Sequence, residues 1–230
     1  MIPNQLLNKI LTDRMVPRDD ADDIKLTSSI SLVECEALYA FLRERKSERV
    51  VEIGMAHGVS AQTILTALKE NEKGQLISLD PYHQWESARL AALANIERAG
   101  LASRHRHIHA GSEMALPQLC AEGMQADFVH IDGHHGFDHA FIDWFYADLL
   151  LSVGGVVAFD NSGWRGVHKT IRYLLTHRKY RELDVGLKRV YRGRTPVHTL
   201  IKRIEGRFGT TRYFEKVEQW EAPYDFYQSF

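Results

Sequence analysis

Short apolar runs alternate along most of the chain with longer stretches whose apolar positions recur at helical spacing. The runs are typical of buried β-strands, and the longer stretches are typical of amphipathic helices. The predicted strands span 49–53, 75–79, 106–109, 126–131 and 156–159. The predicted helices span 31–44, 60–70, 85–99, 115–122, 137–150 and 167–177. A capping box, Ser31-Leu-Val-Glu34, marks the start of the first helix. This alternation predicts right-handed crossovers within one sheet.

The pattern loosens toward the C-terminus. Residues 187–209 are basic and lack a clear period, although 197–204 has a helical pattern. Residues 210–220 alternate as a strand does, and 225–230 is expected to be an edge strand that pairs with it. We therefore expect an α/β protein with a doubly wound, mostly parallel seven-stranded sheet and an antiparallel C-terminal hairpin. Residues 1–27 are expected to form a leader before a single domain over 28–230.

The composition is ordinary for a water-soluble chain, because 44% of the 230 residues are hydrophobic and 26% are charged. No apolar run approaches the roughly 18 residues of a membrane helix, and the first residues lack the hydrophobic core of a signal peptide. Cys35 and Cys120 form neither a disulfide framework nor a metal-knuckle pattern. We therefore expect a cytoplasmic protein with no membrane partner.

Charge is distributed unevenly along the chain. The formal net charge is −1, but residues 165–216 hold 15 Lys and Arg against 4 Asp and Glu. Such a segment favours an anionic substrate, a nucleic acid or an acidic partner, and a solvated basic surface is the plain alternative.

A glycine turn follows the first predicted strand, with the sequence Glu52-Ile-Gly54-Met-Ala-His57-Gly58-Val-Ser60. Glycine allows a tight turn and the close approach of a ligand to the backbone. The start of the next helix offers free N–H groups to a carboxylate or phosphate. The middle glycine of the dinucleotide fingerprint is absent, and Glu52 precedes the turn. Because a carboxylate suits an ammonium and a sulfonium group, these features favour S-adenosylmethionine over NAD.

Polar residues also end the next two predicted strands. Asp80 ends the second strand, where an acid can accept both hydroxyls of a ribose, and Tyr82 is placed to pack on the nucleoside. Gly111-Ser112-Glu113 ends the third strand, close to the expected adenine. Tight turns of an unrelated α/β fold are the alternative. The third strand also carries His105, His107 and His109 at alternate positions, which favours a partly satisfied or solvent-facing row over a metal site.

Two further strand ends carry acids. Asp132 follows one predicted strand, and the Asp160-Asn161 pair follows its neighbour. Two carboxylates and an amide oxygen are hard ligands that suit Mg²⁺, and such an ion lowers the pKa of a hydroxyl bound to it. His135 would then accept the hydroxyl proton as general base. In the alternative, Asp132 only contacts the cofactor and Asp160-Asn161 forms a turn or helix cap.

With these motifs, residues 28–162 resemble the class I S-adenosylmethionine-dependent O-methyltransferases. The 28-residue interval from Asp132 to Asp160, the Asp-Asn pair and the glutamate-glycine turn resemble the catechol O-methyltransferase branch. Ile131-Asp132-Gly-His134-His135-Gly-Phe137 resembles the cephalosporin-hydroxylase-like and macrolide-sugar branch. The catechol enzymes have a lysine at the base position, so His135 fits the second branch and puts catechol in doubt.

The resemblance implies a role for each motif. Ser28 and Ile30 would flank the methionine part of the cofactor, and the turn with Glu52, Gly54, His57, Gly58 and Ser60 would hold its amino-acid end. Asp80 and Tyr82 would contact the nucleoside, and Ser112, Glu113 and His134 would lie at the adenine, with Asp132 also beside the cofactor. Catalysis would use Asp132 and His135, and the metal would be held by Asp132, Asp160 and Asn161.

We therefore expect an Mg²⁺-assisted O-methyltransferase acting on a small hydroxylated acceptor, such as a sugar, a polyketide or a phenolic metabolite. The basic segment favours an anionic acceptor, and residues 187–209 would be an insertion or a cover over the acceptor site. Trp164 would wall that site or plug the sheet. The alternatives are methylation of RNA or another macromolecule, and a non-catalytic S-adenosylmethionine-binding protein. A homodimer through either terminal segment is compatible with the pattern.

Overall fold

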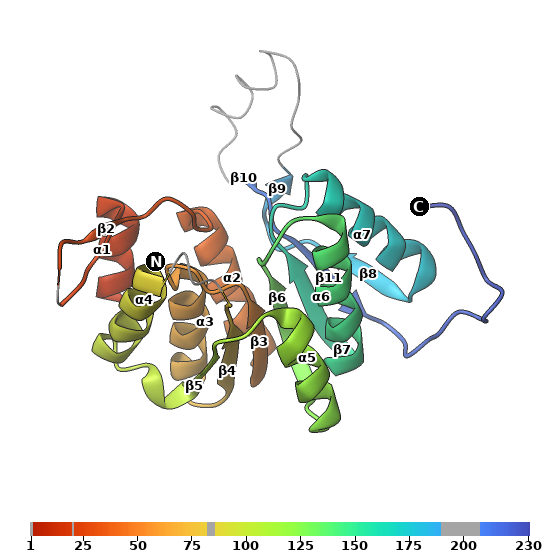
Figure 1. The fold of residues 1–230 in the computed structure, drawn as a ribbon, viewed down its shortest axis with the longest axis horizontal. Helices are drawn as coiled ribbons and strands as arrows, with labels where there is room; N and C mark the ends of the chain where they lie inside the picture. Colours follow the sequence, from red (N-terminus) through yellow and green to blue (C-terminus); the bar gives the residue numbers. More distant parts are fainter. Residues whose placement is uncertain (1, 20, 82–85, 190–207) are drawn as a thin grey trace, which may run out of the picture.

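A seven-stranded sheet with helices on both faces forms the centre of the protein (Figure 1). The computed structural model describes residues 2–19, 21–81, 86–189 and 208–230. The strand order is β5-β4-β3-β6-β7-β11-β8. In that order the strands are His105–Ile108, Gln75–Leu79, Arg49–Ile53, Ala126–Ile131, Leu151–Phe159, Arg212–Lys216 and Tyr180–Leu183. The five strands from β5 to β7 are parallel, and β11 runs antiparallel to both β7 and β8.

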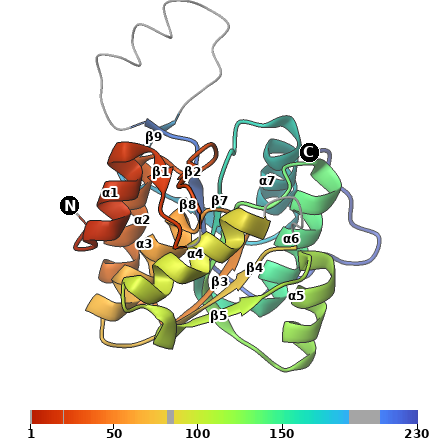
Figure 2. The same cartoon turned by 60° about the vertical axis from the view of Figure 1, so that its left-hand side comes forward.

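Alternate strand residues feed two separate core layers, because successive side chains of a strand point to opposite faces. Val50 packs in one layer and Val51 in the other. Helices α1 (Gln5–Asp13), α2 (Leu32–Arg45), α3 (Val59–Glu70) and α4 (Glu86–Arg98) cover the first face. Helices α5 (Ser112–Ala121), α6 (Phe137–Leu150) and α7 (Arg165–His177) cover the second (Figure 2). The predicted doubly wound architecture is confirmed.

The order in which successive strands are added to the sheet reverses between β3 and β6. The chain runs outward from β3 through β4 to β5, and it then returns so that β6 pairs with the other side of β3. The carboxyl ends of β3 and β6 therefore meet at a topological switch point, where ligands of α/β proteins collect. The glycine turn and Asp132 lie at this point.

The predicted C-terminal hairpin is only partly correct. Strand β11 covers the middle of the predicted 210–220 segment, but its outer partner is β8. Residues 225–230 form no strand; instead the end of the chain lies near α7 (Figure 1). There the rings of Phe226 and Phe230 contact the ring of His177. Aromatic contact with α7 thus replaces edge pairing. The helix predicted over 197–204 lies outside the described residues.

Short elements complete the chain. They are the paired strands β1 (Met15–Val16) and β2 (Ile24–Lys25), the 3₁₀ turn η2 (Ala102–Arg104), and the paired strands β9 (Lys188–Arg189) and β10 (Phe208–Gly209). The N-terminal segment packs tightly, because Leu7, Ile10 and Val16 are fully buried in the layer that also contains α2 and α3. Within the described residues, no helix combines the length and apolar character that a membrane crossing requires.

Candidate active site at the switch point

The glycine turn after β3 is shaped by the protein's own backbone. A Cβ on Gly54 would lie 2.2 Å from the carbonyl oxygen of Asp132, and a Cβ on Gly58 would lie 2.8 Å from the Cβ of Ala92 in α4. Both glycines also have left-handed φ values, +92° and +74°. The neighbouring strand end and α4 therefore already require these glycines, and the approach of a ligand to the turn stays a prediction.

Asp80 fixes the same turn from the adjacent strand end. Its Oδ2 accepts the N–H groups of Met55 at 3.1 Å and Ala56 at 2.7 Å. Ala56 has a left-handed φ of 44°, which is strained for a residue with a side chain. The carboxylate that was predicted to bind a ribose therefore also holds the turn in its unusual conformation.

Glu52 lies fully buried beneath the turn. The hydroxyl of Ser78 donates a hydrogen bond of 2.7 Å to its Oε2. Burial first, and then the charge of Asp80, raises the pKa of Glu52 to about 7. A cation close to this buried acid would lower its pKa again and favour its ionised form.

A cavity of about 180 Å³ opens over the turn, and most of the predicted cofactor residues line it. Those residues are Ser28, Ile30, Gly54, His57, Ser60, Asp80 and Asp132, and the predicted base His135 also lines the cavity. They come from the segment before α2, from the ends of β3, β4 and β6, and from the start of α3. Glu52 and Gly58 lie in or under the turn without lining the cavity. Hydroxyl, imidazole and carboxylate groups around a half-apolar cavity match the polar and apolar parts of S-adenosylmethionine.

The residues predicted at the adenine lie away from this cavity. Ser112 begins α5 and hydrogen-bonds the carboxylate of Asp143, and Glu113 is exposed beside it. His134 is also exposed; its Nδ1 accepts the N–H of Gly136 at 3.1 Å, and its ring contacts His139. Tyr82 lies outside the described residues. The adenine roles of these residues stay predictions.

Asp132 and Asp160 form an acid pair at the ends of β6 and β7. Burial, followed by the charge of Asp160, raises the pKa of Asp132 well above its ordinary range. Two adjacent carboxylates need a proton or a cation between them, and hard oxygen ligands suit Mg²⁺. Among the described residues, no three His, Cys, Asp or Glu side chains gather closely enough to hold a metal ion. A magnesium site here would therefore use the two acids, the amide oxygen of Asn161, and water or acceptor oxygens.

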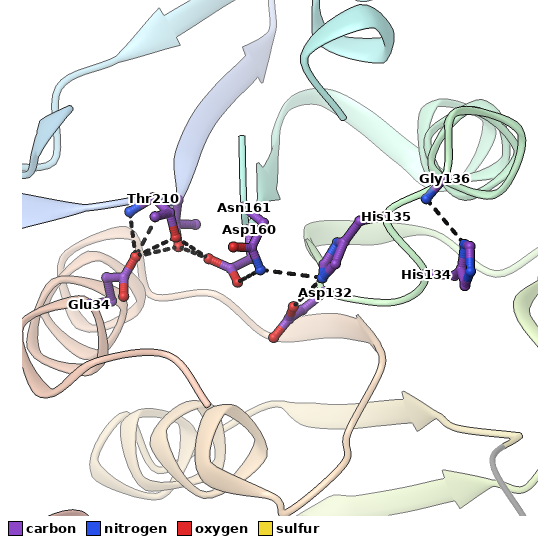
Figure 3. Close-up of polar contacts among 9 residues, drawn as sticks. Glu34, Asp132, His134, His135, Gly136, Asp160, Asn161 and Thr210 are labelled. Atoms are coloured by element: carbon purple, nitrogen blue, oxygen red, sulfur yellow. Dashed lines mark hydrogen bonds and ion pairs between the residues drawn. The ribbon is translucent and has the colours of Figure 1, made fainter. Parts of the chain in front are cut away.

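His135 lies between the acid pair and Trp164. Its Nε2 is 3.8 Å from Oδ1 of Asp132 and 3.2 Å from Nδ2 of Asn161 (Figure 3). The Trp164 ring meets the imidazole edge-on, with the ring centroids 4.9 Å apart. Burial lowers the pKa of His135, although the charge of Asp160 acts in the opposite direction. The neutral imidazole is thereby favoured, and a neutral imidazole can accept a proton.

The start of α7 supports His135 from behind, a feature that sequence reasoning missed. A Cβ on Gly166 would lie 2.5 Å from the His135 carbonyl oxygen and 2.7 Å from the Phe137 nitrogen. The loop that carries His135 thus lies directly on the first turn of α7. Only the close approach of two distant segments reveals this requirement, since a glycine after Trp164 is not by itself informative.

Glu34, Thr210 and Thr211 join the acid pair and were also missed. One oxygen of Glu34 completes the predicted capping box by accepting from Ser31. Its other oxygen accepts the N–H group of Thr210 at 2.6 Å (Figure 3) and that of Thr211 at 3.3 Å. Both threonine hydroxyls also lie within 2.9 Å of Oδ1 of Asp160. No sequence signal links these residues, because the helix and the threonines are more than 170 positions apart.

The histidine row on β5 is partly satisfied, as expected. His105 contacts the Ser78 hydroxyl at 3.0 Å, and its ring and that of His109 flank His107. Burial lowers the pKa of His105 to about 4. The row is satisfied only in part, because both ring nitrogens of His107 are buried without a hydrogen-bond partner among the described residues.

Comparison with known proteins extends these observations. Residues 51–162 match a family model described as a methyltransferase domain. A flavonoid 3',5'-methyltransferase of Vitis vinifera is 28% identical over 131 residues, covering 54% of this chain and 52% of the relative. A caffeoyl-CoA O-methyltransferase of Populus kitakamiensis is 26% identical over 143 residues, covering 60% and 57%. The chain thus spans about half the length of the curated relatives it matches.

A solved structure supports the fold over a longer stretch. The O-methyltransferase from Bacillus cereus in complex with SAH has a TM-score of 0.61 at 16% identity, covering 91% of this chain and 89% of that chain. The matched region contains the glycine turn, the acid pair and His135. Residues 51–162 are thus similar to a methyltransferase domain, and the longer stretch has the fold of solved methyltransferase structures.

Proposed function

We propose that this protein is an O-methyltransferase that transfers the methyl group of S-adenosylmethionine to a hydroxyl of a small acceptor with the help of Mg²⁺. One observation carries the proposal. Asp132 and His135 line the cofactor cavity and also belong to the acid cluster with Asp160 and Asn161. A methyl donor in the cavity would therefore lie next to both the metal ligands and the base.

Each group would have its own role in the in-line transfer of the methyl group. The cavity residues would hold the cofactor, with Glu52 and Ser60 under its amino-acid end and Asp80 at its ribose. A bound magnesium ion would lower the pKa of the acceptor hydroxyl. His135 would take the hydroxyl proton as the oxygen–methyl bond forms and the sulfur–methyl bond breaks, leaving S-adenosylhomocysteine. Catalysis would rest mainly on positioning and on the exclusion of water.

The acceptor is best argued from the chemistry around His135. Trp164 is 45% exposed while its ring meets His135, so the exposed part of its side chain can contact a flat acceptor. Two relatives are named for flavonoid and caffeoyl-CoA substrates, which are phenolic. We therefore favour a phenolic hydroxyl over a sugar or a polyketide. The anionic acceptor, the homodimer and the cytoplasmic location stay predictions.

The first test is a calorimetric titration with S-adenosylmethionine, with Mg²⁺ and again with a chelator. We expect micromolar binding, followed by Mg²⁺-dependent transfer of a labelled methyl group to phenolic acceptors. Absence of cofactor binding under both conditions would overturn the proposal. Transfer that is equally fast in chelator would overturn the metal's part alone. Salt-sensitive binding and methylation of RNA would instead support the macromolecular alternative.

A further inference from the structure

The two threonine hydroxyls near Asp160 make more close contacts with carboxylate oxygens than they have protons to donate. Each of the two threonine hydroxyls lies near both Oε1 of Glu34, at 3.0 and 3.3 Å, and Oδ1 of Asp160, at 2.8 and 2.9 Å. A hydroxyl has one proton to donate. Oε1 of Glu34 already accepts the backbone N–H groups of Thr210 and Thr211. The hydroxyl protons of both threonines are therefore available for Asp160, which is also the nearer oxygen.

The backbone ties the same two segments together. The carbonyl of Thr210 accepts the N–H of Ser162 at 3.1 Å and also its hydroxyl. Asn161, between Asp160 and Ser162, has a left-handed φ of 49°. Its Nδ2 donates to Oδ2 of Asp160 at 2.9 Å. Thr210 thus contacts the turn through Asp160 on one side and Ser162 on the other, and its position determines where the carboxylate of Asp160 points.

The carboxylates in this arrangement are buried, so each of them needs a hydrogen-bond donor or a cation. Glu34 and Asp160 are each 6% exposed, and Thr211 is 5% exposed. Among the described residues, no Lys or Arg forms an ion pair with Glu34, Asp132 or Asp160. Buried carboxylates without a cationic side chain are held by hydrogen bonds or by a bound cation. Because the threonines occupy Oδ1 of Asp160, its Oδ2, which also accepts from Nδ2 of Asn161, is the oxygen left for Asp132 and a shared cation.

We propose that Thr210 and Thr211 are positioning residues of the methyl-transfer site, which hold Asp160 toward Asp132 for a divalent cation while Glu34 anchors both threonines. This inference rests on the proposed Mg²⁺-assisted function. It adds a role for the chain just after β10 and for α2, neither of which supplies a ligand. Groups that orient metal-binding carboxylates commonly change metal affinity about 10- to 100-fold when they are removed.

The test measures metal binding apart from catalysis. The full chain, saturated with S-adenosylmethionine, is titrated with Mn²⁺, and free Mn²⁺ is followed by electron paramagnetic resonance. The variants are Thr210→Val with Thr211→Val, which keeps side-chain shape and removes both hydroxyls, and Thr210→Ser with Thr211→Ser, which keeps them. Thr63→Val is the matched control, because Thr63 is fully buried and its hydroxyl, among the described residues, bonds within α3 and to Cys35.

We expect the double valine variant to bind Mn²⁺ at least about tenfold more weakly, with cofactor affinity within about twofold of wild type. The double serine variant and Thr63→Val should bind Mn²⁺ as wild type does. Equal Mn²⁺ affinity in the wild type and the folded valine variant would overturn the role of the threonines while leaving the metal site standing. A wild type that binds the cofactor but no Mn²⁺ would overturn the metal proposal and this inference together. If the double variant does not fold, Thr210→Val alone, at the half-buried position, is held to the same criterion.

Discussion

Asp132 and Asp160 face each other one residue beyond the ends of adjacent parallel strands. The N–H of Asp160 donates to the Ile131 carbonyl at 2.9 Å, and this bond places the two acids side by side. Burial and the charge of Asp160 hold the pKa of Asp132 well above its ordinary range. Without a proton or a cation between the two carboxylates, the pair is therefore costly in its doubly ionised form.

Replacing Asp160 should separate metal use from cofactor binding. For Asp160→Ala we expect Mg²⁺-dependent turnover to fall by about a hundredfold or more, since metal polarisation contributes several kcal/mol. Affinity for S-adenosylmethionine, measured by calorimetry, should stay near that of wild type because Asp160 does not line the cavity. Glu97→Ala, which removes an exposed acid from α4, serves as the control. Unchanged turnover in the Asp160 variant would contradict the metal mechanism.

Replacing His135 should remove the base without removing the cofactor site. For His135→Ala we expect kcat to fall by about 10²- to 10⁴-fold, the usual contribution of a positioned general base, with little change in cofactor affinity. His139→Ala is the matched control, because His139 contacts the exposed His134 ring instead of the acid pair. The two rates are compared with labelled cofactor, and near-normal turnover of the His135 variant would exclude it as the base.

Gly166 tests whether α7 positions His135. In a helix an alanine is ordinarily more stable than a glycine by about 1 kcal/mol, yet here its Cβ would lie 2.5 Å from the His135 carbonyl oxygen. We expect Gly166→Ala to lower kcat by at least about tenfold, because the loop must move. Gly123→Ala should lose about 1 kcal/mol of stability from its left-handed φ and keep its rate, since open space surrounds that position. Equal rates in both variants would refute the positioning role.

Glu52 should make the cofactor-free protein less stable as pH rises. Its pKa is about 7 in the folded chain, raised first by burial, against an ordinary 4.5. Below the ordinary value the carboxyl is protonated in both states and the full stability is present. As pH rises through the folded pKa, up to about 3 kcal/mol of unfolding free energy is lost. Glu52→Gln should lack this loss.

Urea unfolding of the two proteins measures the effect. The stability of Glu52→Gln relative to wild type should increase between about pH 5 and pH 8, because only the wild type must bury an ionised carboxylate. A difference between the two proteins that stays constant across this range would show that Glu52 keeps an ordinary pKa.

Local patterns predicted most of the sheet and its helices. Strands 49–53, 75–79 and 126–131 and helix 137–150 are found at the predicted residues. Each of these strands is an apolar run that ends at a glycine or an acid, so its period and its end are both visible in the sequence. The prediction of the edge strand at 225–230 was wrong. The actual edge strand, Tyr180–Leu183, is short and charged, whereas the aromatic tail over 225–230 has a pattern that resembles a strand. Packing of that tail on α7 overrides its local pattern.

The sequence by itself determined which chemical groups stand at the strand ends: Glu52, Asp80, Asp132, His135 and the Asp160-Asn161 pair. Because parallel strands present their carboxyl ends at one edge of a sheet, their meeting could be predicted. Only the tertiary structure decided that Gly54 is required by Asp132, that Gly166 is required by His135, and that Glu34 and two threonines hold Asp160. These relationships depend on contacts between segments far apart in the chain. Their distances are set by how whole layers pack, and no local pattern of residues encodes them.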